Sequence, residues 1–173
     1  MMRYSISQPA LLLAGILICN HSVIAADMTF MGELIEPACT LENDKILVDM
    51  GTVFEQYIYA NQRTPGTLFE LRLKNCDLTH TNRVKVTFEG LHNTALPTLL
   101  AVNGGANRGI AIGLETPSGQ AVPLGNTEDY PLLTGDNTLK LKAYIQGEPN
   151  ALINKTIVRS AFSAIATFTL EYF

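Results

Sequence analysis

A strand pattern runs through the stretch Ala164-Ile165-Ala166-Thr167-Phe168-Thr169-Leu170-Glu171-Tyr172-Phe173. From Ala166 onward, apolar and polar side chains alternate strictly, so an apolar residue returns at every second position. Successive side chains of a β-strand point to opposite faces, and this period of two therefore predicts a strand with one buried and one solvent-facing side. An amphipathic helix would instead place its apolar residues three or four positions apart.

The same alternation returns in three stretches farther up the chain, at 69–74, 84–89 and 139–144. Two shorter apolar runs, Ile46-Leu47-Val48 and Ile110-Ala111-Ile112, are further strand candidates. No long stretch has the periodicity of an amphipathic helix, so the strands must pack against one another.

Turn-forming residues separate these strands. Clusters of Gly, Pro, Asn, Asp and Ser occur at 64–66, 103–105, 117–119 and 134–137. The cluster at 117–119 also predicts a hairpin between 110–115 and 121–124. Many short strands with frequent turns predict an all-β fold, a sandwich of two sheets.

Length and charge exclude several classes of protein. The chain has 173 residues, which is the size of one domain rather than of a large multi-domain enzyme. Its 12 basic and 16 acidic residues give a net charge of -4 without a basic block, which argues against a nucleic-acid partner. The 47% of hydrophobic residues argues against intrinsic disorder.

The first 26 residues have the features of a secretory signal. Arg3 supplies a positive start, an apolar run follows at 10–18, and Val23-Ile24-Ala25-Ala26 offers a cleavage site with small residues. The apolar run is shorter than the roughly 20 residues that a membrane-spanning helix needs. No later stretch is long and apolar enough to span a bilayer, so we expect an exported protein without direct membrane insertion.

Export changes the meaning of the cysteines. Of the three, Cys19 lies in the signal, which leaves Cys39 and Cys76 in the mature chain. Two cysteines in an exported chain predict one disulfide. The loop that it closes corresponds to about 4 kcal/mol of stabilisation on a chain-entropy model.

A second alternating stretch begins the mature chain. Met28, Phe30, Gly32 and Leu34 form one face, and the residues between them form the other. The residues alone allow two interpretations. This stretch and the last one are either the first and last strands of a closed sandwich, or strands that find partners outside the domain.

Five segments, in this order, resemble the pilins of the bacterial chaperone–usher pathway. They are Gly32-Glu33-Leu34-Ile35-Glu36-Pro37-Ala38-Cys39-Thr40-Leu41, Leu71-Arg72-Leu73-Lys74-Asn75-Cys76, Val84-Lys85-Val86-Thr87-Phe88-Glu89-Gly90, Gly109-Ile110-Ala111-Ile112 and the C-terminal stretch 164–173. The resemblance covers essentially the whole mature chain. It departs at Ser160, where the family usually has Gly, and this affects the expected backbone geometry before the last strand.

The resemblance implies an incomplete immunoglobulin-like β-sandwich, a pilin fold that lacks its last strand. Residues 27–38 would form an N-terminal donor-strand extension, and 39–173 the pilin domain. Met28, Phe30 and Leu34 would enter the groove of a neighbouring subunit, and Gly32 would leave one position empty.

The resemblance also assigns the C-terminal strand to a groove. The residues implied to line it and to contact a chaperone are Ala164, Ala166, Phe168, Leu170, Tyr172 and Phe173. The terminal carboxylate of Phe173 is implied to anchor on basic residues of that chaperone. Main-chain pairing along the groove would be independent of sequence, while alternate side chains would set the register.

The implied partners are a periplasmic pilus chaperone, an outer-membrane usher and neighbouring pilin subunits. The route would lead through the periplasm to an extracellular fimbrium that supports cell adhesion. The segment Leu-Lys-Asn-Cys at 73–76 resembles adaptor pilins of P-pilus type more than shaft pilins. A major shaft pilin or a pilus terminator remains an alternative within the pathway.

A different class, a free secreted carbohydrate-binding sandwich, would need exposed aromatic residues in a pocket, and the chain has no Trp. We found no pattern for a catalytic site, a metal site or a cofactor, and expect no enzyme. His80 and His92 stand singly in polar loop stretches, and 104–109 lacks the Lys-Ser/Thr ending of a phosphate loop. Tyr57 and Tyr59 are expected to pack at an edge strand rather than to form a contact patch.

Overall fold

A computed structural model describes residues 28, 31, 36–103 and 108–173. The chain divides into two compact units, residues 1–34 and 35–173, and the fold below is that of the second. The predicted signal at 1–26 and the predicted donor residues Phe30, Gly32 and Leu34 lie outside the described residues.

The second unit is built from antiparallel strands and two helices of seven and six residues. In chain order these elements are β1 (Thr40–Leu41), α1 (Glu55–Asn61), β2 (Thr67–Cys76), β3 (Arg83–Gly90), β4 (Leu100–Ala101), β5 (Ile110–Glu115), β6 (Ala121–Val122), β7 (Thr127–Pro131), β8 (Gly135–Gly147), α2 (Pro149–Asn154) and β9 (Ala166–Tyr172). The all-β fold predicted from the sequence is confirmed.

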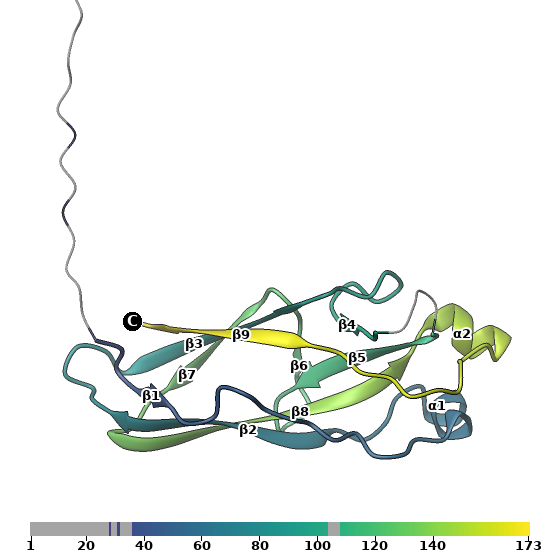
Figure 1. Cartoon of the computed structure of the whole chain (residues 1–173), viewed down its shortest axis with the longest axis horizontal. Helices are drawn as coiled ribbons and strands as arrows, with labels where there is room; N and C mark the ends of the chain where they lie inside the picture. The colour runs from purple at the N-terminus through teal and green to yellow at the C-terminus, as the bar shows by residue number, and fades with distance from the viewer. Residues whose placement is uncertain (1–27, 29–30, 32–35, 104–107) are drawn as a thin grey trace, which may run out of the picture. The chain divides into compact units, whose positions relative to one another are not determined.

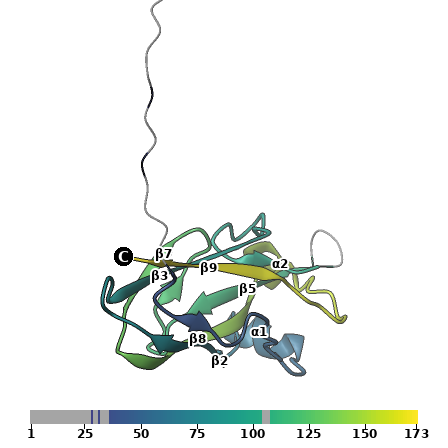
Figure 2. The same cartoon turned by 60° about the vertical axis from the view of Figure 1, so that its left-hand side comes forward.

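The strands form two sheets. One has the order β1-β2-β8-β5-β4, with β6 beside β5, and the other has the order β7-β3-β9. In Figures 1 and 2 the yellow strand β9 runs beside β3 in one layer, while β2 and β8 lie in the other. The last strand in sequence is therefore an edge strand of the smaller sheet.

The core lies between the two layers and follows the predicted alternation. Leu71 and Leu73 of β2, Val84 and Val86 of β3, and Leu141 of β8 are all fully buried. Each such side chain stabilises the fold by about 1.5–3 kcal/mol through removal of apolar surface from water. The intervening residues of β2 and β3 face outward, as a period of two requires.

The hairpin predicted around Pro117-Ser118-Gly119 joins β5 to β6. Its turn closes with the Gly119 N–H donating to the Thr116 carbonyl at 2.9 Å. Gly119 has a φ of 89°, a left-handed conformation that glycine adopts without a steric penalty. The turn residues therefore set this connection locally.

The helices were not predicted. With seven and six residues, α1 and α2 are too short to show a helical period. The expectation that Tyr57 and Tyr59 pack at an edge strand is wrong, because both lie in α1. The Tyr59 hydroxyl accepts a hydrogen bond from the Ile157 N–H at 3.0 Å, which ties α1 to the segment after α2.

Candidate functional site

A groove lies along one edge of β9. That strand pairs with β3 from Val84↔Tyr172 to Gly90↔Ala166. Within the described residues, no strand pairs with its other edge. An unpaired edge presents a row of main-chain N–H and C=O groups that can template another strand.

Across the groove from β9 runs an extended segment, residues 44–53, which we call the wall. The wall and residues 160–168 enclose a cavity of about 840 Å³. Its floor is apolar and consists of Phe69, Phe88, Leu100, Ile112, Leu114 and Ala143. These residues come from both sheets, so the cavity opens directly onto the core.

Side chains of the wall alternate between half-buried and exposed as in a strand, but its main chain is not hydrogen-bonded to another strand of the described ranges. Ile46, Val48 and Met50 are half-buried against the core, whereas Leu47 between them is 95% exposed. No main-chain hydrogen bond is made by 44–50 to any part of the chain that the structure describes. The stretch 46–48, predicted as a strand, has the alternating burial of a strand. It is not hydrogen-bonded to any other strand in the described chain.

A second cavity continues the groove toward the end of β9. It measures about 570 Å³ and lies between Leu170 and Tyr172 on one side and residues 36–41 on the other. Cys39 lines it, and a disulfide joins Cys39 to Cys76 at the end of β2, as two cysteines in the mature chain predicted. The disulfide thus anchors the chain where it forms this part of the groove.

The residues predicted for the groove occupy one side of the last strand, with one exception. Ala164, Phe168, Leu170 and Tyr172 pack half-buried against the core. Ala166 belongs to the same face and lines the larger cavity, yet it is exposed. An exposed residue on the core-facing side of a strand means that nothing in the described chain covers it.

The exception is Phe173, which lines neither cavity. Its ring lies 4.0 Å from the Lys85 ammonium, in a cation–π contact, and its carbonyl oxygen accepts from the Thr81 hydroxyl. Tyr172, the preceding residue, turns toward the groove, and burial raises the pKa of its phenol. Tyr172 thus lines the second cavity, while Phe173 turns away from it.

Three aromatic rings, those of Phe69, Phe88 and Phe168, line the larger cavity. Phe69 and Phe88 meet edge to face with centroids 6.4 Å apart, and Phe88 and Phe168 are 6.3 Å apart. Beyond them, small residues at Ala161, Ala164 and Ala166 leave the larger cavity deep. The groove can therefore receive bulky apolar side chains at this end.

Several groove residues were missed by the sequence analysis. Phe162 packs on the core two positions before Ala164, so the alternation that marked the last strand in fact begins earlier. Phe69 and Phe88 were expected as strand residues but not as part of a site. No local signal could have shown that they lie beneath the same opening.

Metal and membrane features add nothing to this site. Across the described residues, no group of three or more His, Cys, Asp or Glu side chains could hold a metal ion. None of the helices in the described ranges is long and apolar enough to cross a membrane.

Known proteins share this sequence and fold. The family model described as "Fimbrial protein" matches residues 28–173. The fimbrial adapter PapK of Escherichia coli is 34% identical over 177 residues, which cover 96% of this chain and 98% of PapK. The fimbria A protein of Serratia marcescens is 30% identical and covers 84% of this chain and 83% of its own length.

A solved structure, the P pilus rod subunit PapA, superposes with a TM-score of 0.68 over 79% of this chain and all of its own. At 23% identity this likeness concerns the fold, which is therefore that of a pilus subunit. Together with the family match over the entire described unit, it agrees with the resemblance in the sequence. The chain belongs to the fimbrial protein family and is a structural subunit of a fimbria.

Proposed function

We propose that this chain is an adaptor subunit that joins two neighbouring subunits of a fimbria by strand exchange. The observation that carries the proposal is the groove along the free edge of β9, with an unpaired strand-like wall opposite. An extended segment of another protein fills it, pairing with main-chain groups and placing alternate side chains into the two cavities. Pilins are among the known examples of such strand addition.

The energetics favour occupation of the groove. An open edge above an apolar floor is an aggregation hazard in water. Each bulky apolar side chain that an incoming strand buries contributes about 1.5–3 kcal/mol. Two or three such side chains therefore offset much of the entropy lost when the segment becomes ordered.

The chain also offers a strand of its own. We assign residues 27–38 to a donor extension and 39–173 to the pilin domain, after removal of a signal at 1–26. Met28, Phe30 and Leu34 would enter a neighbour's groove, with Gly32 at a shallow position. The alternation of these residues supports the assignment.

Before assembly, a periplasmic pilus chaperone lends a strand to the groove, and an outer-membrane usher exchanges it for the extension of the next subunit. The groove residues from Ala164 to Tyr172 are the chaperone contacts, and Phe173 lies at the end of that strand. The 34% identity to the PapK adapter over nearly the whole chain supports the adaptor role. The fibre itself is extracellular and supports cell adhesion, and no chemical step is required of the subunit.

Periplasmic expression tests this proposal. Without a chaperone, the chain should be degraded or should polymerise. With a cognate pilus chaperone, it should be purified as a 1:1 complex. A synthetic peptide of residues 27–38 serves as the probe of a donor extension, because main-chain pairing in the groove does not depend on sequence, and it should displace the chaperone. The matched control peptide carries Phe30→Arg. A stable monomer that neither chaperone nor peptide binds would contradict the proposal.

A further inference from the structure

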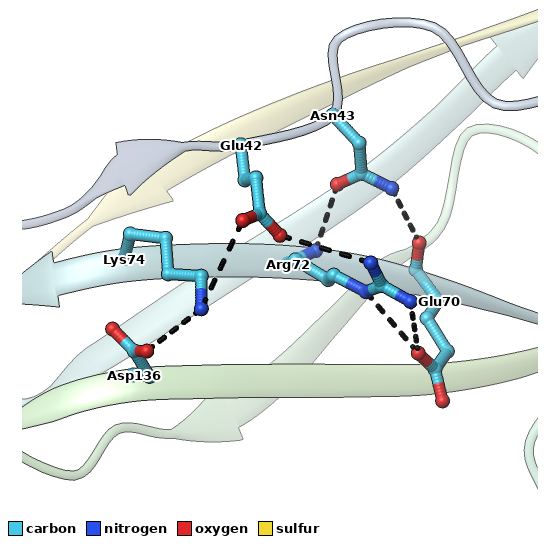
Figure 3. A network of polar contacts seen from close by, with 6 residues as sticks. All are labelled: Glu42, Asn43, Glu70, Arg72, Lys74 and Asp136. Atoms are coloured by element: carbon cyan, nitrogen blue, oxygen red, sulfur yellow. Dashed lines mark hydrogen bonds and ion pairs between the residues drawn. The ribbon is translucent and has the colours of Figure 1, made fainter.

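Asn43 lies where the chain leaves the larger sheet to become the wall. Its amide oxygen accepts the Arg72 N–H at 2.9 Å, and its amide nitrogen donates to the Glu70 carbonyl at 2.8 Å. Figure 3 shows both bonds reaching from Asn43 to the edge of β2. The side chain of Asn43 therefore bonds two neighbouring main-chain groups, the Arg72 N–H and the Glu70 carbonyl, on the edge of β2 that faces β1.

These two groups are the ones that a longer β1 would use. The ladder runs through Thr40↔Lys74 and Leu41↔Leu73, and the Glu42 N–H donates to the Arg72 carbonyl at 2.9 Å. In a continued antiparallel ladder, the Arg72 N–H would next pair with the Glu42 carbonyl, and the Glu70 carbonyl with the N–H of residue 44. The Asn43 amide takes both places.

The consequence is that the main chain after Asn43 is released from β2. The Arg72 N–H and the Glu70 carbonyl are already bonded to Asn43, so the first two bonds of a continued ladder are not available to the main chain of 42–44. At the far end of the wall, the Gly51 N–H donates to the Asp49 carboxylate at 2.9 Å, and Gly51 has a φ of 63°. Two side-chain contacts thus mark the start and the end of an unpaired segment.

Ion pairs hold the starting point in place. Glu42 lies 3.9 Å from the Arg72 guanidinium and 3.8 Å from the Lys74 ammonium, and Lys74 lies 2.7 Å from Asp136 of β8 (Figure 3). Each exposed pair stabilises only weakly. Together they tie the end of β1 to β2 and β8, so the direction in which the wall departs is set at Asn43.

We propose that Asn43 is a positioning residue for strand exchange. Its amide ends the β1–β2 ladder and directs the wall across the groove from β9, so that an incoming strand finds main-chain partners on both sides. This inference rests on the proposed function, because it concerns the partner strand of the same groove. Asn43 itself touches neither cavity.

The test compares two asparagines with the same local bonding. Asn137 also bridges main-chain groups, accepting from the Leu133 N–H at 2.8 Å and donating to the Leu133 carbonyl at 2.6 Å, but it lies at the start of β8 and lines neither cavity. Asn43→Ala and Asn137→Ala are each purified with the chaperone. A labelled peptide of residues 27–38 is then titrated, and its half-displacing concentration is measured.

We expect Asn43→Ala to raise that concentration about tenfold or more, since several ladder bonds on one side are lost or strained. Asn137→Ala should change it less than about twofold at a similar loss of thermal stability. Asn43→Asp keeps the oxygen that accepts from Arg72 but loses the donor to Glu70, and should fall between. Equal effects of the two alanine variants would overturn the inference.

Hydrogen exchange of the wild-type chain gives an independent readout. The amides of 44–50 should exchange fast in the empty groove and become protected when the peptide binds. Unchanged exchange on binding would overturn the inference even if Asn43→Ala fails to fold. A wild-type chain whose groove binds neither the chaperone nor the peptide would instead contradict the proposed function.

Discussion

Phe88 of β3 and Phe168 of β9 are directly paired across their ladder, with ring centroids 6.3 Å apart on the side that faces the groove. Phe88 is buried, and Phe168 is only half-buried because its outer side faces the larger cavity. The same two rings therefore pack on the core and line the larger cavity of the groove. Core stability and strand binding depend on one another at this point.

Replacing Phe168 with Ala should weaken both properties. Because the ring is half-buried, we expect a loss of about 1–3 kcal/mol in unfolding free energy, below the range for a fully buried Phe. Peptide affinity should fall as well, since the floor loses its apolar contact. Urea unfolding of the peptide-filled chain and peptide titration measure the two effects. Leu133→Ala, at an exposed apolar residue, is the control and should leave both unchanged.

Substitutions in the donor extension should block incorporation into the fimbria without blocking chaperone binding. In the proposed donor role Gly32 meets a shallow part of a neighbour's groove, so the long charged side chain of Gly32→Arg should keep the variant from joining the preceding subunit. Chaperone binding, which uses the groove of this chain, should persist. Met31→Arg is the matched control, because Met31 belongs to the opposite face and is 93% exposed. Equal incorporation of both variants, measured on purified fimbriae, would count against the donor role.

A buried ion pair on the outer face of the larger sheet should matter for stability alone. Glu115 is 4% exposed and accepts a hydrogen bond from the Arg63 guanidinium at 2.7 Å, while Arg63 stacks 3.8 Å from the Tyr144 ring. Arg63→Ala leaves a buried carboxylate without its partner. We expect a cost of about 2 kcal/mol, less than for fully buried pairs because Arg63 reaches solvent.

Arg83→Ala removes the ion pair with Asp129, in which the two side chains are 43% and 40% exposed, and should cost less than about 1 kcal/mol. Chemical denaturation of the peptide-filled variants compares the two. Peptide affinity should remain at the wild-type level in both. Equal costs would mean that burial of Glu115 does not determine the strength of the pair.

The pair of Lys74 and Asp136 should make stability depend on pH at both extremes. The hydrogen bond that the Lys74 ammonium donates to the Asp136 carboxylate lowers the pKa of Asp136 below its ordinary value of 3.8 and raises the pKa of Lys74 above its ordinary value of 10.5. The contribution of Asp136 is present above its unfolded-state pKa and is lost as the pH falls through the lowered one. The contribution of Lys74 is present below its unfolded-state pKa and is lost as the pH rises through the raised one.

Asp136→Asn removes this pair with little change in shape. At pH 7 the variant should therefore unfold at lower urea concentration than the wild type. The two curves should converge as the pH falls through the lowered pKa of Asp136 and as it rises through the raised pKa of Lys74, because one member of the pair then loses its charge in the folded chain. If the difference between the two urea midpoints were constant over the whole pH range, the Asp136→Asn substitution would act through packing rather than through charge.

The sequence alone indicated most of the longer strands and which side of each is apolar, but it did not reveal β7 (Thr127–Pro131). The last strand was predicted to run to Phe173, and β9 spans Ala166–Tyr172. Leu71, Leu73, Val84 and Val86 are buried as their alternation required. The reason is that period two is a local property, which each strand carries in its own residues. The turn at 117–119 and the disulfide also followed from local chemistry.

Only the tertiary structure decided which strands have partners. The stretch at 46–48 has the same pattern as the others, yet it stands unpaired opposite β9, and nothing in its residues distinguishes it. The difference arises at Asn43, whose amide satisfies the edge of β2 from a distance of 27 to 29 residues along the chain. Strand pairing joins main-chain groups that are far apart in the sequence, so no single segment shows which edge remains free. The groove therefore follows only from the way in which the strands are arranged.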